Sequence, residues 1–347
     1  MGRKRRKNSR STRRSFGRHK KSPETIFWIV LIAVIALSGT GFFVHNTLFS
    51  SWGASASEQD QNQPVAVEVE EPNPEQENDH VWEPKKPDGQ KNILLLGLDD
   101  RGMSDLIMII SYDLSTYESA LLSIKRDTFV SNQDWAPQDS GQDHLAWANN
   151  RGMGQNNDYH AGARLAAKTV EDLLDIDLHA YASITLDGFI RLVDYIGGVE
   201  ITVAPEFSER GLPTGLQQLD GKQALIYSRH RQNPRIPEPG SASQHEDRVL
   251  RNQHLLKGML EQCKTMETEQ LMEVTEQLDD KLYTSLEDWD ILDLLNLLYN
   301  QDPEGMETAV LPGEGEIIYQ ERIDSKTYYY FPDFEETDHL LQRLGLK

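Results

Sequence analysis

The chain has 347 residues and a formal net charge of -21, but its basic residues are unevenly distributed. The first 21 residues hold 11 of the 35 Lys and Arg and no acid, which leaves 24 basic against 56 acidic side chains in the rest. This acidity excludes casual binding to nucleic acid, because a polyanion is repelled wherever no local basic patch overrides the general field. The single cysteine, Cys263, excludes an internal disulfide and is expected to be buried filler on an apolar helix face.

The N-terminal part predicts a membrane anchor. Residues 26–44 carry no charge and are long enough to cross a bilayer of roughly 30 Å as one helix. The basic tail, residues 1–25, and the acidic region after the span place the N-terminus in the cytoplasm and the bulk of the chain outside. A cleaved signal peptide is the alternative, although the apolar run exceeds the usual length of about 7 to 15 residues and no A-x-A site follows. Residues 45–90 predict an acidic, disordered extracellular linker, and residues 91–347 the catalytic domain.

Apolar runs and helical spacing alternate through the rest of the chain. Short β-branched runs between turn signals predict buried strands, and apolar residues at every third or fourth position predict helices. We therefore expect an α/β fold: a layered α-β-α domain around a central mixed sheet, preceded by one transmembrane helix. Strands are expected at 92–98, 106–113, 119–125, 180–186, 197–203 and 306–312, and helices at 158–175, 187–197, 219–230, 246–263, 285–299 and 333–345.

The usual short catalytic motifs do not occur, and one loop stands out by composition. The sequence has no P-loop, G-x-S-x-G, H-E-x-x-H or C-x-x-C pattern. Residues 149–157, NNRGMGQNN, are dense in Asn and Gly. This density predicts a mobile loop that closes over a substrate, with a plain surface loop as the alternative.

Five of the thirteen arginines that follow the tail fall within 23 residues, at positions 229, 231, 235, 248 and 251. Arg248, Arg251 and Asn252 share one helical face, while Arg229 and Arg231 share a side only if the chain is extended there. We therefore expect the helix to end near Arg229. Each arginine alone could equally pair with a surface carboxylate, but the concentration favours an anion site, because guanidinium groups match phosphate oxygens.

Carboxylates and another arginine follow the first strands. Asp99 comes after the first strand, Asp105 opens the second, and Arg126 follows the third. Residues at strand ends face the ligand crevice of a layered α/β sheet, so these groups are expected to converge. Carboxylates beside arginines are typical of Mg²⁺ held against phosphate. An aspartate at a strand end is, taken alone, more often a turn former or helix cap.

The sequence resembles the LytR-CpsA-Psr cell-wall family over about residues 92–251, and more loosely to the C-terminus. The segments that carry the resemblance, in order, are NILLLGLDDRGMSDLIMIISYD, LLSIKRDTFV, TVEDLLDIDLHAYASITLDGFIRLVDYIGGVEITV, LDGKQALIYSRHR and EDRVLRNQHLL. The resemblance implies a transferase that uses Mg²⁺ or Mn²⁺ to move a glycopolymer, such as a teichoic acid or capsule chain, from a polyprenyl pyrophosphate carrier to peptidoglycan. Its partners would be that carrier-linked polymer, peptidoglycan and the lipid bilayer, without nucleic acid.

Position by position, the resemblance assigns roles to residues of this chain. Asp99 and Asp105 fall on the metal and catalytic carboxylates, and Arg126 on a residue that is both catalytic and pyrophosphate-binding. The pyrophosphate-binding set comprises Arg126, Arg229, Arg231, Arg248, Asn252 and Gln253, with Arg101 as a substitute for an arginine that is Met103 here. Lys125 in place of a proline and His245 in place of an aspartate also depart from the family pattern.

Two other functions fit the same residues. A non-catalytic sensor of wall precursors would use the arginines to bind phosphate and would have lost turnover at Met103 and His245. A polyprenyl pyrophosphatase would use water as the acceptor. The three functions differ in whether lipid monophosphate is released and whether the release needs an acceptor sugar.

Overall fold

The computed structural model describes Trp82 and residues 89–113, 115–130, 135, 142–230, 242–267, 270, 278, 280–286, 293, 300 and 305–347. The predicted membrane span at 26–44 and most of the predicted linker lie outside these residues, as do Arg231 and Arg235. Within the described part of the chain, no helix is both long enough and apolar enough to span a bilayer.

A six-stranded mixed sheet forms the centre of the fold. Strand β1 pairs antiparallel with β2 and parallel with β4, and β2 pairs antiparallel with β3. The end of β1, the start of β2 and the end of β3 therefore lie side by side at the same end of the strands, and this end is called the sheet edge. The strand order is β7-β4-β1-β2-β3-β8, with β1 (Gln90–Leu98), β2 (Ser104–Asp113), β3 (Glu118–Ile124), β4 (Ala180–Thr185), β7 (Leu282–Thr284) and β8 (Glu307–Val310).

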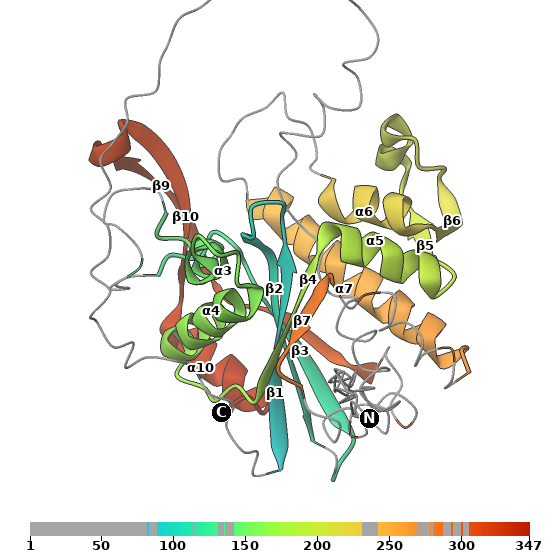
Figure 1. Ribbon diagram of the computed structural model, residues 1–347, viewed down its shortest axis with the longest axis horizontal. Coiled ribbons are helices and arrows are strands. Elements are labelled where there is room, and N and C mark those ends of the chain that lie inside the picture. Colours follow the sequence, from blue (N-terminus) through green and yellow to red (C-terminus); the bar gives the residue numbers. More distant parts are fainter. Residues whose placement is uncertain are drawn as a thin grey trace, which may run out of the picture.

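Helices cover both faces of this sheet, which confirms the predicted α-β-α layers (Figure 1). Side chains alternate along β1, so that Ile93 and Leu95 join one core while Leu94 and Leu96 join the other. Burial on both faces explains why the strand is a continuous apolar run. One face carries α5 (Leu186–Tyr195), α6 (Gly221–Arg229) and α7 (Ala242–Lys264), and the other α3 (Trp147–Met153), α4 (Tyr159–Leu174) and α10 (Phe334–Arg343).

Helix α6 ends where its sequence predicts, but it begins at Gly221, two residues after the expected start at 219. Asp220 and Gln223 form a reciprocal capping box that satisfies backbone N–H groups of the first turn. The helix ends at Arg229, and His230 already has an extended backbone. The expected end near Arg229 is confirmed.

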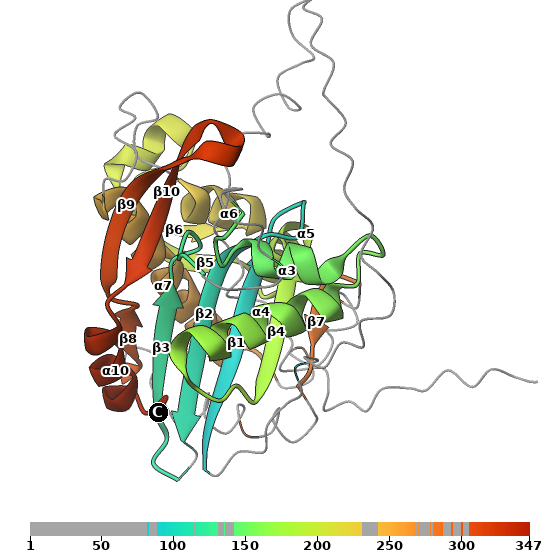
Figure 2. The same ribbon diagram turned by 90° about the vertical axis from the view of Figure 1, so that its left-hand side faces the viewer.

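Two hairpins were not expected in full from the sequence. Strand β5 (Val199–Val203) pairs with β6 (Gly215–Leu219), and the short helix η2 (Pro205–Arg210) lies in the connection between them. Strand β9 (Gly313–Gln320) pairs with β10 (Ser325–Pro332) across η4 (Glu321–Ile323). The second hairpin extends away from the main sheet as a twisted ribbon (Figure 2).

The loop prediction for residues 149–157 is wrong for its first five residues, because 149–153 form the end of α3. Close packing explains the glycine there: a Cβ on Gly152 would lie 2.7 Å from the carbonyl oxygen of Ala161 on α4. Glycine thus permits contact between two helices at this position, whereas its density in the sequence indicated flexibility.

Trp82 lies inside the range predicted as linker, yet it is 4 % exposed and belongs to the core beneath α4. Its ring lies edge-on to that of Tyr181, with centroids 5.5 Å apart. The helix expected at 285–299 lies almost entirely outside the described residues.

Candidate anion-binding site

A buried ion pair connects β2 with the segment after β3. Arg126 Nη1 pairs with Asp105 Oδ1, and Arg126 Nε lies 3.5 Å from Asp127 Oδ1. Asp105 is 2 % exposed and Arg126 9 %. The expected convergence of Asp105 and Arg126 at the sheet edge is therefore confirmed. A buried pair of this kind costs desolvation and is weak evidence for stability.

Helix α7 adds Arg248 and Asn252 to the same place. These residues lie one helical turn apart and are 4 % and 5 % exposed. Asn252 Oδ1 makes no hydrogen bond within the described residues. This oxygen is therefore available to accept a hydrogen bond from a ligand that enters the cavity. The polar side chains around a cavity of about 20 Å³ here are those of Asp105, Ser123, Lys125, Arg126, Arg248 and Asn252.

The volume of this cavity limits what it holds in the present conformation. About 20 Å³ is the space of roughly one water molecule, so a diphosphate needs the lining side chains to move. Arg248 on α7 contributes a positive charge to the cavity lining. An anion that enters can compete with Asp105 for the guanidinium group of Arg126.

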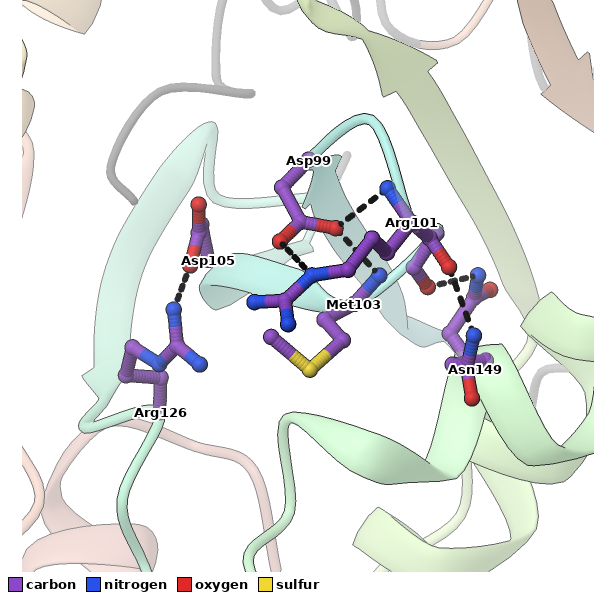
Figure 3. Close-up of polar contacts among 8 residues, drawn as sticks. Asp99, Arg101, Met103, Asp105, Arg126 and Asn149 are labelled. Carbon is purple, nitrogen blue, oxygen red and sulfur yellow. Dashed lines mark hydrogen bonds and ion pairs between the residues drawn. The ribbon is translucent and has the colours of Figure 1, made fainter. Parts of the chain in front are cut away.

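The loop between β1 and β2 holds Asp99 by its own backbone (Figure 3). Asp99 Oδ1 accepts hydrogen bonds from the N–H groups of Arg101 and Met103, each at 2.9 Å. Arg101 Nε lies 3.5 Å from Asp99 Oδ2, and the Arg101 side chain is 62 % exposed. Asp99 therefore forms the turn, as the simpler interpretation expected, and still presents Oδ2 to a charged partner.

Asp99 and Asp105 would supply two carboxylates to a metal ion, which are too few to complete its coordination shell by themselves. Within the described residues, no group of three or more His, Cys, Asp or Glu could hold a metal ion. Mg²⁺ normally binds through one or two carboxylates, with substrate phosphates and waters completing its shell. The donor set thus suits a cation that arrives with a phosphate, and Asp99 Oδ2 and the Asp105 carboxylate are the oxygens that would hold it.

The other residues predicted for the site are placed differently. The amide Nε2 of Gln253 donates to Ser123 Oγ at 2.9 Å and to the Ala309 carbonyl at 3.1 Å, so it serves to fix α7 on the sheet. Arg229 is the last residue of α6 and is partly exposed. Neither residue lines the cavity. The side chain of His245 lies outside the described part of the structure.

Arg251 has a contact that the sequence did not indicate. Its Nη2 donates to the His230 carbonyl at 2.5 Å, and its guanidinium carbon lies 5.7 Å from the centre of the Phe207 ring. Arg251 therefore ties α7 to the end of α6, where the segment with Arg229 and Arg231 begins. The spacing of Arg251 from Arg248 placed both residues on one helical face. In the folded chain, however, Arg248 lines the cavity whereas Arg251 binds the His230 carbonyl.

The fold and these residues define a three-layer α/β protein with a buried, arginine-lined site suited to a phosphate group. The LytR_cpsA_psr family matches residues 55–345, and the chain belongs to this family.

Similar proteins have related names and the same fold. A relative in Oceanobacillus iheyensis, the polyisoprenyl-teichoic acid–peptidoglycan teichoic acid transferase TagU, is 28% identical over 331 residues, which cover 93% of this chain and 94% of the relative. A Bacillus cereus protein with the same name is 26% identical, with 90% and 94% covered. The solved structure of TagV from B. subtilis has a TM-score of 0.57 at 20% identity and covers 76% of this chain and 100% of its own. TagT bound to LIIa-WTA has a TM-score of 0.57 at 21% identity, with 74% and 90% covered.

Proposed function

We propose that this chain is a membrane-anchored transferase that moves an anionic glycopolymer from a polyprenyl pyrophosphate carrier to peptidoglycan outside the cell. The proposal rests on family membership and on the names of the relatives that match nearly the whole chain. The observation that carries it is the buried group of Asp105, Arg126, Arg248 and Asn252 at the sheet edge.

The arginines would bind the diphosphate and stabilise the charge that develops during transfer. Phosphoryl transfer spreads negative charge over the transferred phosphoryl oxygens, and fixed guanidinium groups lower the energy of that arrangement. Arg126 and Arg248 are buried, so their interaction with an anion is weakly screened by solvent. Arg229 at the end of α6, and Arg231 two residues later in the sequence, would add further guanidinium groups, and Arg101 would take the place of the arginine that is Met103 here.

Asp105 would receive the proton of the acceptor hydroxyl. A diphosphate that takes Arg126 away from Asp105 leaves this carboxylate able to accept a proton. The hydroxyl oxygen forms a bond to the phosphorus that carries the glycopolymer, and the bond from this phosphorus to the bridging oxygen breaks. Polyprenyl monophosphate leaves, and the proton passes to Asp105. A Mg²⁺ or Mn²⁺ ion held by Asp99 and Asp105 would neutralise charge on the phosphate oxygens.

A turnover assay tests this proposal. The full chain in detergent, given a lipid pyrophosphate donor, a peptidoglycan fragment and Mg²⁺, should release polyprenyl monophosphate only when the acceptor is present. Arg248→Met should abolish release, whereas the control Arg322→Met, at an exposed position on η4, should leave it unchanged. Binding without release would indicate the sensor, and release without acceptor the pyrophosphatase.

The anchor and the topology belong to the same proposal. Residues 26–44 would span the bilayer once, with the basic tail inside and residues 91–347 outside. A tether of this kind keeps the site near a carrier that is itself confined to the membrane, which raises its effective concentration. Protease added to intact protoplasts should degrade the folded part; protection of that part would contradict the topology.

A further inference from the structure

One short segment, residues 145–150, contacts three parts of the candidate site. The carbonyl oxygen of Ala146 accepts a hydrogen bond from Ser104 N at 2.9 Å, and Ala146 N donates to the Arg126 carbonyl at 3.0 Å. Ser104 directly precedes Asp105 in the chain. A single residue of this segment therefore fixes the backbone beside both members of the buried ion pair.

Two consecutive side-chain amides of α3 bind the third part, the loop of residues 99–103 between β1 and β2 (Figure 3). Asn149 Nδ2 donates to the Gly102 carbonyl at 2.8 Å, and Asn150 Nδ2 donates to the Arg101 carbonyl at 2.6 Å. Asn149 is fully buried. Its amide is thus shielded from water, which strengthens its directional control over the loop.

The loop and α3 pack too closely for either to shift independently. Gly102 has a φ of +74°, and a Cβ there would lie 2.3 Å from Met153 Sδ. From α4, a Cβ on Gly162 would lie 2.6 Å from the Asn149 carbonyl oxygen. Helix α3 is therefore held between α4 and the loop, and Asn149 lies at the point where all three meet.

We propose that Asn149 is a positioning residue for phosphate transfer, an inference that rests on the function proposed above. Gly102 lies between Arg101 and Met103, whose N–H groups both bind Asp99 Oδ1. Any displacement of Gly102 moves these two donors, and with them the Asp99 carboxylate. Asn149 acts through this loop on Asp99 and Asp105, the two carboxylates assigned to the cation and the acceptor proton.

The replacement Asn149→Asp tests this role, because it keeps the shape of the side chain but places a carboxylate oxygen against the Gly102 carbonyl. The value of kcat for acceptor-dependent release should fall about tenfold to a hundredfold, since small misplacements of reacting groups carry losses of this size. KM for the lipid donor should change less than about threefold, because Arg126 and Arg248 still bind the diphosphate. Asn156→Asp, the same chemical change at an exposed position after α3, should leave both constants unchanged.

Amide hydrogen exchange provides a readout that does not depend on turnover. In Asn149→Asp, the N–H groups of Arg101 and Met103 should exchange faster, while those in the centre of β1 keep their wild-type rates. If the wild-type chain shows no turnover, the proposed function fails, and the exchange measurement still decides whether Asn149 holds the loop.

Two results would overturn the proposal. One is a kcat within twofold of wild type in a folded Asn149→Asp chain. The other is a loss of kcat that only matches the fraction of unfolded protein, since this would make the role purely structural. Should Asn149→Asp not fold, Asn150→Ala removes the second, partly exposed amide and should reduce kcat in the same direction by a smaller factor; unchanged kcat there would also refute the proposal.

Discussion

Replacing Arg126 by Met should destabilise the fold by about 3 to 5 kcal/mol, because it leaves the Asp105 carboxylate buried without its guanidinium partner. The size follows from burial: Asp105 is 2 % exposed and Arg126 9 %, so solvent screens little of the lost interaction. Removal of the charge on Asp105 should reverse most of this loss. The double variant Arg126→Met/Asp105→Asn should therefore unfold with a free energy close to that of the wild-type chain.

The double-mutant cycle gives a coupling energy that can be compared with that of an exposed pair. Lys168 and Asp172 pair across one turn of α4 and have side chains 34% and 42% exposed. Their coupling should be about 0.3 to 0.5 kcal/mol, the usual value for exposed i,i+4 pairs. For Arg126 and Asp105 we expect a coupling of at least about 2 kcal/mol.

Urea unfolding of the wild-type chain and the variants of both cycles at pH 7 measures these energies. The reasoning is refuted if Arg126→Met loses less than about 1 kcal/mol, or if its coupling to Asp105 equals that of the exposed pair. Turnover separates stability from function: the double variant should be stable yet inactive. An active double variant would remove both residues from the proposed mechanism.

Three further predictions concern single residues. Trp82→Ala should lower the free energy of unfolding by about 3 to 5 kcal/mol, because Trp82 is 4 % exposed in the core; thermal unfolding equal to wild type would show that it does not belong to the folded unit. Gly102→Ala should cost more stability than Gly154→Ala, since both have positive φ but only the Cβ at Gly102 would meet Met153 Sδ, at 2.3 Å; equal losses in urea would mean that the contact is unimportant. Burial raises the pKa of the Cys263 thiol from 9.0 to about 12. The native chain should therefore not react with a thiol reagent at pH 8, and rapid native labelling would contradict this. Stability should fall as pH rises from 9 toward 12, because the unfolded chain loses the thiol proton before the folded chain does.

Several elements were accessible from the sequence because they depend on local pattern. Continuous apolar runs predicted β1, β2 and β3 to within about two residues at each end. The extended spacing of Arg229 and Arg231 predicted where α6 ends, and His230 indeed has an extended backbone. The approach of Asp105 and Arg126 followed from their positions at strand ends.

Other elements depended on contacts between distant segments. Asn149 looked like part of a flexible loop, yet it is buried in a helix because glycines on α3 and α4 permit close packing. Gln253 and Arg251 both lie on α7 close to Arg248, but Gln253 binds Ser123, 130 residues away in sequence, and Arg251 binds the His230 carbonyl. Periodicity alone could not assign these partners.

The sequence by itself determined the layered α/β architecture, the charge division between tail and body, and the residue types available to bind a phosphate. The tertiary structure decided which arginines line the cavity, which residues brace the fold, and how the Asp99 loop is held. The physical reason is that hydrophobic period fixes which side of an element is buried, whereas the group that meets each polar side chain depends on how separate elements pack together.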